Sequence, residues 1–288
     1  MMMDATLDVG PDVVDASVDV YVDAPPQRAI WVATPTTLFN FDPVARTMTR
    51  VADFACSGEP MVDLAMNAQE QLFGITSESV VAIDKTTGAC TEIARGAQAL
   101  PYGTGFVPAS SLDSGVETWL GYVFTTYDAI DPDSGALTFE GNLGFKAGNF
   151  QASGDMVAIA GGNAYLTGMG LDPMTGDGII QFDPNTGAAT QLLGVTGVPA
   201  MVGLAQWAGI LYAFTVSGSV YRIQLLDAGP AVQLLAVSYD FGDASVPDAM
   251  ASDAGDAGEA GDAAMEAAPS LLPLTFRGAA VTTRAPSQ

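Results

Sequence analysis

The chain has few side chains that could act as general bases or bind metal ions. It contains no histidine, the most common general base, and its two cysteines are too few for a four-thiolate zinc site. Carboxylates remain, and Asp63 stands out because the positions that we align with it are all small, namely Gly105, Ala158, Gly203 and Gly278. We expect Asp63 to be the single carboxylate near a central channel. There it could hold a cation or a polar ligand group, or simply accept main-chain N–H groups.

Three more residues are candidates for contact with a ligand in the same channel. Glu59 and Asn149 could add oxygen atoms to that of Asp63, and carboxylate and amide oxygens are the ligands that calcium prefers. Trp207 ends a predicted innermost strand and could reach the mouth of a pocket, although packing between sheets is the more ordinary role of such a tryptophan. We assign no catalytic residue and no metal ligand from these residue types.

A second group of acids opens a repeated turn. Four apolar runs end in Asp and continue through a short polar turn into another strand-like run; the four acids are Asp42, Asp84, Asp131 and Asp183. Asp131 and Asp133 bring oxygens together as a calcium loop would. The hairpin interpretation is stronger, because Asp accepts N–H groups of a type I turn and the Gly that ends three of these turns takes the left-handed conformation.

The spacing of these turns predicts the architecture. The four acids lie 42, 47 and 52 residues apart, and a period of this length made of strands and hairpins is typical of a β-propeller. The second unit is the clearest, with strands predicted at 61–66, 71–76, 80–84 and 90–95. The first unit lacks an innermost strand, and the segment 275–284 matches the innermost strands elsewhere.

We therefore expect an all-β fold, a single β-propeller with five four-stranded blades, closed by the C-terminal strand joining the first blade. Closure by both chain ends removes free sheet edges. A sixth blade would require an extra hairpin inside the third or fourth unit.

Acidic residues are concentrated in two segments outside the repeats. Residues 1–23 contain six Asp and residues 240–266 contain eight Asp or Glu, and neither segment contains Lys or Arg. Such segments bury too little apolar surface to offset the entropy of ordering them. We expect residues 1–27 to be a disordered acidic linker. Within a propeller of residues 28–286, we expect 240–270 to be a disordered acidic loop inserted before the closing strand.

The charge also limits the partners. The formal net charge is −24, with 9 Lys or Arg in 288 residues, and contact with phosphates requires clustered bases. We expect no nucleic-acid binding, no transmembrane segment and a monomer.

The Asp-Pro-x-Thr-Gly turns, together with segments 153–159, 202–205 and 277–283, resemble secreted bacterial propellers of the YncE and quinoprotein-like superfamily. The resemblance covers residues 28–286 apart from the acidic loop, and it implies a fold rather than an activity. It also implies an extracytoplasmic location, periplasmic or at the cell surface. The signal sequence would then be absent from this chain, whose start has neither a basic region nor an apolar core.

The exported context bears on the two cysteines. Cys56 and Cys90 lie 34 residues apart, and the predicted strand map places them near opposite faces of the disc, which argues against a bond. An even number of cysteines in an oxidising compartment favours one. We favour the disulfide.

We expect a non-enzymatic binding or scaffold propeller, exported or surface-tethered, with an unknown protein or carbohydrate ligand and no cofactor. The alternative is a calcium-dependent hydrolase, resembling propeller lactonases that seat a divalent cation in the central channel. That chemistry needs several oxygens at one point, and Asp63, with help from Asn149 or Glu59, is the candidate to supply them. A quinone-dependent dehydrogenase is less favoured, because those propellers are longer than this chain.

Overall fold

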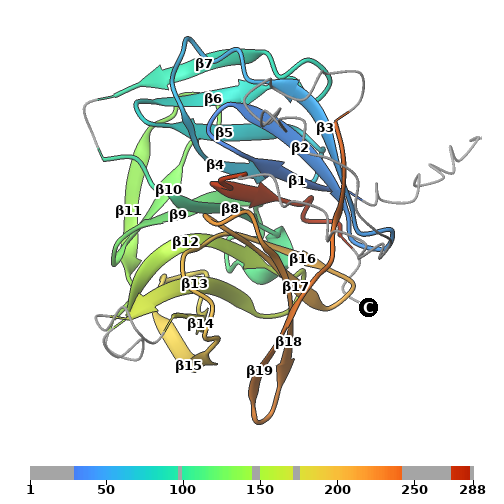
Figure 1. Ribbon diagram of the computed structural model, residues 1–288. Coiled ribbons are helices and arrows are strands. Elements are labelled where there is room, and N and C mark those ends of the chain that lie inside the picture. Colours follow the sequence, from blue (N-terminus) through green and yellow to red (C-terminus); the bar gives the residue numbers. More distant parts are fainter. Residues whose placement is uncertain (1–28, 97–98, 145–149, 171–175, 242–273, 286–288) are drawn as a thin grey trace, which may run out of the picture.

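Five β-sheets stand around a central axis, with one strand of each sheet at the centre (Figure 1). This is the five-bladed propeller expected from the repeated turns. Apart from a short 3-10 turn at Ala109–Ser111, the regular elements of the described part of the chain are β-strands. The computed structural model describes residues 29–96, 99–144, 150–170, 176–241 and 274–285.

Blades 2 to 5 each contain four antiparallel strands that follow one another outward in chain order. Blade 2 comprises β4 (Met61–Met66), β5 (Leu72–Thr76), β6 (Ser79–Ile83) and β7 (Cys90–Arg95). Blade 3 comprises β8 (Gly103–Val107), β9 (Thr118–Val123), β10 (Thr126–Ile130) and β11 (Leu137–Asn142). Blade 4 comprises β12 (Phe150–Ala158), β13 (Ala164–Gly170), β14 (Asp177–Phe182) and β15 (Ala189–Val195). Blade 5 comprises β16 (Met201–Trp207), β17 (Ile210–Thr215), β18 (Val220–Leu226) and β19 (Gly229–Leu234).

Blade 1 is built from both ends of the described chain. Its N-terminal strands are β1 (Ile30–Ala33), β2 (Thr37–Asp42) and β3 (Thr47–Asp53), and its innermost strand is β21 (Gly278–Ala280). Strand β21 pairs antiparallel with β1, and Figure 1 shows the two side by side at the centre of the ring. The predicted closure is therefore confirmed. The closing strand is shorter than the predicted 275–284, because the chain leaves the sheet after Ala280.

A fifth strand, β20 (Ser238–Asp240), lies on the outer edge of blade 1, parallel to β3. The sequence interpretation had placed Asp240 in the disordered loop, and that assignment was wrong. The outer edge of β3 offers unpaired main-chain groups, and the Ser238 N–H donates to the Arg46 carbonyl over 3.0 Å. Apart from Phe241, the rest of the predicted loop 240–270 lies outside the described residues, as does the predicted linker 1–27.

The repeated Asp residues act as hairpin caps. In each of the four turns, Oδ1 of the Asp accepts main-chain N–H groups, one from two residues further along and in three turns another from three residues further along. Gly88, Gly135 and Gly187 end three of these turns with φ of 66–68°. Arg46 occupies the same place in the first turn with φ 57°. The turn interpretation is thus confirmed.

The core consists of five apolar clusters, and each fills the space between two neighbouring blades. Aromatic rings dominate several of them: Trp119 stacks on Phe106 with centroids 5.6 Å apart between blades 2 and 3, where Phe73 also packs. Because every blade contributes to two clusters, the core holds the ring together.

A disulfide joins Cys56 and Cys90, whose Cα atoms lie 4.9 Å apart. The predicted strand map had separated them, and it was wrong on this point. Ala55 forms a parallel bridge with Ala89, so the segment after β3 runs beside the turn before β7. The bond therefore links blade 1 to blade 2.

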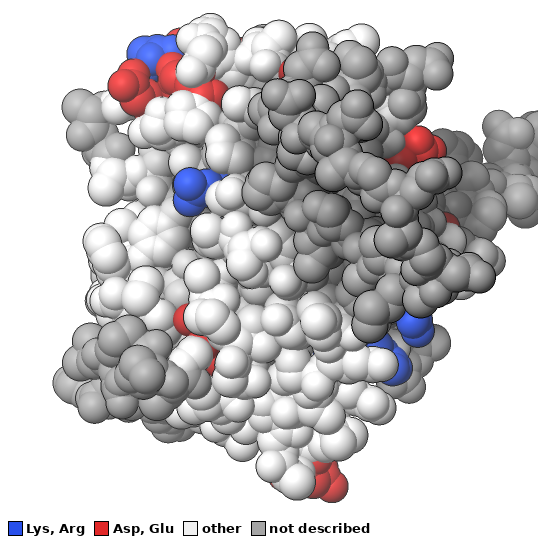
Figure 2. Space-filling view, viewed as in Figure 1, with Lys and Arg blue, Asp and Glu red and all other residues white. Residues whose placement is uncertain are grey.

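Charged side chains are few and scattered on the described part of the face shown in Figure 2. One local cluster surrounds Arg95, which pairs with Glu59, Glu78 and Glu92. Within the described ranges, none of the elements is a helix long and apolar enough to span a membrane.

Candidate functional site

One level of the central channel is formed by equivalent residues of the five innermost strands. These residues are Asp63, Gly103, Asp155, Gly203 and Gly278, and their neighbours around the ring contact one another in blade order. Two carboxylates thus share this layer with three glycines. The layer divides the space on the axis into a part toward the beginnings of the innermost strands and a part toward their ends.

Asp63 is fully buried and binds two main-chain N–H groups. Its Oδ1 accepts the N–H of Leu64 over 2.8 Å, and its Oδ2 accepts the N–H of Thr104 over 2.6 Å. Leu64 belongs to blade 2 and Thr104 to blade 3. The carboxylate therefore joins two adjacent innermost strands at a point where they do not pair as a sheet.

Asp155 makes the same kind of contact and reaches further. Its Oδ1 accepts the N–H of Met156 over 2.7 Å, and its Oδ2 accepts those of Leu204 over 2.9 Å and Ala279 over 3.2 Å. These donors belong to blades 4, 5 and 1. One side chain thus fastens the closing strand β21 to the middle of the ring.

The expectation of a single axial carboxylate was wrong, because Asp155 is the second. The sequence alignment had placed Ala158 and Gly105 opposite Asp63, where the structure has Asp155 and Gly103. The pairing register of β12 with β13 shifts between Ala152 and Met156. β4 and β16 shift in the same way just before Asp63 and Gly203, which were aligned with each other, so the bulge does not set Asp155 apart. The innermost strands of neighbouring blades do not pair as a sheet, and their equivalent residues are identified by the contacts that they make across the axis.

Burial away from water raises the pKa of both carboxyl groups well above their ordinary value. For Asp155, repulsion from the neighbouring Asp63 carboxylate raises the pKa further. The main-chain N–H donors act in the opposite direction and lower the pKa of each group. The electrostatics of the layer therefore favour retention of a proton by the pair.

The glycines make room for these side chains. A Cβ on Gly278 would overlap Oδ1 of Asp63, and a Cβ on Gly203 would lie 3.1 Å from Ala279. A Cβ on Gly103 would overlap the carbonyl oxygen of Gly154. The small residues at the axis are thus required by the close approach of five strands, as the sequence indicated.

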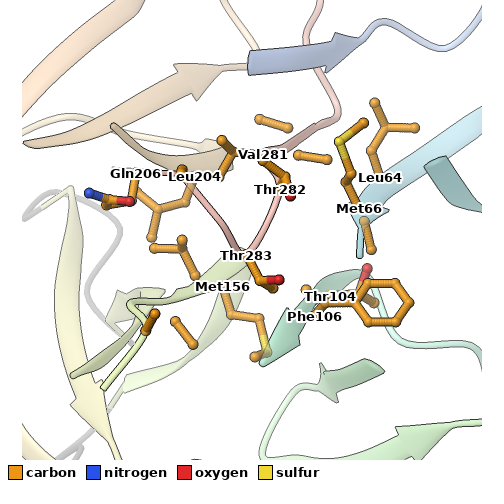
Figure 3. A pocket seen from close by; sticks show the side chains of 18 residues that line it. Leu64, Met66, Thr104, Phe106, Met156, Leu204, Gln206, Val281, Thr282 and Thr283 are labelled. Carbon is orange, nitrogen blue, oxygen red and sulfur yellow. The ribbon is translucent and has the colours of Figure 1, made fainter. Parts of the chain in front are cut away.

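Beyond the layer, the channel is narrow, and most of the residues that line it have apolar side chains. Figure 3 shows side chains such as Leu64, Phe106, Met156 and Leu204 arranged around it. The free volume is about 20 Å³, enough for roughly one water molecule. This part of the channel is therefore too small for an organic substrate.

The chain's own C-terminal segment crosses this end of the channel. After β21, the hydroxyl of Thr282 donates to the Asn67 carbonyl over 3.1 Å, and the hydroxyl of Thr283 donates to the Glu117 carboxylate. Figure 3 places both threonines among the lining side chains. Ring closure and channel closure are thus performed by one segment.

The opposite end of the channel opens into a cavity of about 360 Å³, which we call the mouth cavity. All five blades contribute to it, four of them close to the start of the innermost strand and blade 4 within β12; its lining residues are Pro60, Met61, Val62, Tyr102, Ser153, Gly154, Val202 and Arg277. Small-ligand pockets typically have volumes of about 300–1,000 Å³, so this one is large enough for a small molecule.

A second cavity of about 270 Å³ adjoins the mouth cavity and shares Ser153 and Val202 with it. Asp177 lines it, and burial raises the pKa of this carboxyl to about 6. Its Oδ2 accepts the N–H of Met201 over 2.7 Å and the hydroxyl of Ser153 over 3.2 Å. The sequence interpretation missed Asp177; as the first residue of β14 after a glycine at φ 71°, it carries no signal that distinguishes it from a turn residue.

The other predicted ligand residues do not join Asp63. Glu59 binds the hydroxyl groups of Thr76 and Ser79 and pairs with Arg95, all on blade 2. Trp207 is 7% exposed and packs in the cluster between blades 5 and 1. Asn149 lies outside the described residues.

The axial pair does not fit a calcium ion. Each of its four carboxylate oxygens already accepts at least one main-chain N–H, and a donor hydrogen competes with a cation for the same lone pairs. Calcium takes six to eight oxygen ligands, and even with the buried hydroxyl of Thr104 only three side chains would contribute. Within the described ranges, no group of three or more His, Cys, Asp and Glu residues could hold a metal.

Comparison with known proteins gives fold-level similarity. No protein-family model matches the chain, and no curated protein matches it. Among solved structures, a symmetrical protein described for its de novo evolutionary emergence is similar at 16% identity over 74% of this chain and 94% of that one, with a TM-score of 0.47. A gluconolactonase from Xanthomonas campestris is similar at 13% identity over 74% and 75% of the two chains, with a TM-score of 0.42.

BamB from Moraxella catarrhalis is similar at 15% identity, with a TM-score of 0.35. The match covers 75% of this chain and 62% of BamB, so the chain spans less than two thirds of that protein. The five-bladed architecture itself rests on the strand pairing of the present chain.

Proposed function

We propose that this chain is a non-enzymatic binding propeller, and that its ligand enters the mouth cavity. The observation that carries the proposal is the arrangement on the axis. An open cavity lined by all five innermost strands ends at a buried layer in which Asp63 and Asp155 are bound to main-chain N–H groups. The carboxylates at the base of the cavity are structural, and the cavity above them is free for a ligand.

The buried layer on the axis makes hydrolysis in the channel a weaker candidate function than binding. A lactonase-like hydrolase would need a cation and a substrate at the same point, and the oxygens of Asp63 and Asp155 are used for N–H groups. The alternative of a calcium-dependent hydrolase therefore has less support than binding.

We further propose that the protein acts as a monomer outside the cytoplasm. The disulfide between Cys56 and Cys90 supports this location, because disulfides persist in oxidising compartments. Fractionation of cells that express the gene, followed by alkylation under non-reducing conditions, tests the location, and sedimentation of the purified chain tests the monomer. A reduced thiol pair in the cytosolic fraction would contradict the proposed location.

Binding can be tested by closing the cavity. Val202 lines the mouth cavity, so Val202→Trp should fill it. Val44→Trp is the matched control, because Val44 is 63% exposed on a hairpin of blade 1. A mixed set of small organic acids, sugars and short peptides is screened by ligand-observed NMR against the wild-type chain and both variants.

We expect bound compounds to be lost with Val202→Trp and kept with Val44→Trp. Binding that both variants retain would place the site elsewhere and overturn the proposal. Turnover of lactones or sugar esters by the purified chain, abolished by a calcium chelator, would favour the hydrolase instead.

A further inference from the structure

We propose that the mouth cavity selects a small organic carboxylate, whose apolar body lies against the innermost strands and whose carboxylate pairs with Arg277. This inference rests on the proposed binding function and names the class of ligand. It follows from the composition of the cavity, the hydrogen bonds of its polar groups and the position of the single cation among its described lining residues.

The walls of the mouth cavity are mostly apolar. Pro60, Met61 and Val62 come from the start of blade 2, Val202 comes from blade 5, and the ring of Tyr102 comes from blade 3. Such walls favour an apolar ligand body, because its transfer from water into contact with them is favourable. A sugar, with hydroxyl groups on every side, would leave many of them without partners there.

Most polar side chains of the mouth cavity are already used within the protein. The Tyr102 hydroxyl accepts the Phe124 N–H over 2.8 Å and donates to the Ala152 carbonyl over 3.2 Å. The Ser153 hydroxyl donates to Asp177. Neither group has a proton left to give to a ligand.

Arg277 differs from these groups. Among the described residues that line the mouth cavity it alone carries a charge, and within the described chain it takes part in no ion pair. Its main-chain N–H donates to the Ala33 carbonyl over 2.8 Å, which fixes its position immediately before β21. In a chain with 33 acids and 9 bases, an arginine at a cavity with no ion pair to any described acid is a feature that its described surroundings do not explain.

The guanidinium geometry points to a carboxylate. Arginine presents parallel N–H donors that match the two oxygens of a carboxylate, and such a charge-assisted pair is stronger than a neutral hydrogen bond. A phosphate dianion would need further donors, and Arg277 is the single cation among the described residues that line the cavity. A monocarboxylate with an apolar body satisfies both the charge and the walls.

The probes are phenylacetate and hexanoate, with the neutral amide phenylacetamide as the matched compound. Affinities are measured by calorimetry and NMR titration for the wild-type chain, Arg277→Gln and Arg277→Lys. Arg222→Gln is the control, because Arg222 lies on β18 and is not among the residues that line the cavity. Arg277 is exposed, so its variants should keep the wild-type melting temperature.

We expect phenylacetate to bind the wild-type chain and Arg222→Gln equally, and to bind Arg277→Gln at least about tenfold more weakly. The affinity of Arg277→Lys for phenylacetate should lie between those of the wild-type chain and Arg277→Gln. Phenylacetamide should bind all four proteins as weakly as phenylacetate binds Arg277→Gln. Equal affinity for the acid and the amide, unchanged affinity in Arg277→Gln, or no detectable binding of either acid would overturn the inference.

These results are separable from the proposed function. If the screened compounds are lost with Val202→Trp but not with Arg277→Gln, the cavity binds ligands and the carboxylate inference alone is wrong. If Val202→Trp weakens the binding of neither the charged nor the neutral compounds, the proposed binding function itself is wrong.

Discussion

Gly278 and Asp63 meet at the axis so closely that the glycine leaves no room for a side chain. A Cβ at position 278 would overlap Oδ1 of Asp63 and lie 2.7 Å from the Asp63 Cα. We predict that Gly278→Ala lowers the free energy of unfolding by about 1–3 kcal/mol or more, because the closing strand must move away from blade 2. Urea denaturation measures this effect.

Gly162→Ala is the control for the loss of a glycine, since the nearest atom to a Cβ there is 3.4 Å away. It should change stability by much less than Gly278→Ala. Equal effects at the two positions would contradict the axial packing described above.

A second prediction concerns the N–H groups bound by Asp155. Asp155→Ala removes the acceptor for the N–H groups of Leu204 and Ala279 inside the ring. Because an unsatisfied buried N–H costs about 1–3 kcal/mol, we expect a loss of about 2–6 kcal/mol. Asp155→Asn should cost less, since its remaining oxygen can still accept.

The measurement is chemical denaturation, with hydrogen exchange of β21 as the local readout. Asp133→Ala serves as the control, because Asp133 lies on the surface in a turn, and it should stay within about 0.5 kcal/mol of wild type. Unchanged exchange in β21 of Asp155→Ala would show that the carboxylate does not hold the closing strand.

The pH dependence of stability follows from opposite shifts. Burial raises the pKa of Asp63, Asp155 and Asp177, so the folded state binds more protons than the unfolded state above about pH 4. The stability that these three groups add to the folded state is fully present below the unfolded pKa, and it is lost as the pH rises through the folded pKa. The pKa values of Asp84 and Asp131 are lowered by main-chain N–H groups, so their contribution is lost as pH falls below about 4.

We therefore predict maximal stability near pH 4–5, below the range of about pH 5–8 that is usual for proteins. For Asp177, a pKa of about 6 corresponds to a loss on the order of 3 kcal/mol between pH 4 and 7. Denaturation at a series of pH values tests this, and Asp177→Asn should flatten the slope between pH 4 and 6. A stability that rises steadily to pH 7 would contradict the prediction.

The repeats could be predicted from the sequence because they depend on local chemistry. The turn acids such as Asp84 bind N–H groups two and three residues away, so spacing alone revealed the hairpins and, through their period, the blades. The closing strand could be found because its Gly-Ala pattern repeats that of the other innermost strands.

The axial layer depends on contacts between distant segments, and there the sequence was insufficient. Asp155 was missed because the innermost strands of neighbouring blades belong to separate sheets, so that contacts across the axis identify their equivalent residues. The bond of Cys56 to Cys90 was uncertain because it depends on how two hairpins lie side by side. Arg277 was read only as part of the closing segment. That it lines a cavity and forms no ion pair with the described acids can be seen only in the structure, where five innermost strands meet.

The disulfide gives a further prediction. In the chain-entropy model, cross-linking residues 34 positions apart stabilises the folded state by about 4 kcal/mol. The double variant Cys56→Ser, Cys90→Ser should therefore unfold at markedly lower urea concentration than the oxidised wild type and match the reduced wild type. A difference between the double variant and the reduced wild type would mean that the serines themselves disturb the contact between blades 1 and 2.

The first hairpin offers a stabilising substitution. Arg46 holds φ 57° at the place where the other three Asp turns have glycine, and a left-handed conformation costs a residue with a Cβ about 1 kcal/mol. We predict that Arg46→Gly raises the free energy of unfolding by up to about 1 kcal/mol, while Arg46→Ala, which removes the charge but keeps the Cβ, leaves it nearly unchanged. Gly88→Ala should lower the free energy of unfolding, because Gly88 is also left-handed and a Cβ there would overlap the Asp53 carbonyl oxygen. Equal melting temperatures for Arg46→Gly and Arg46→Ala would show that backbone strain does not limit this turn.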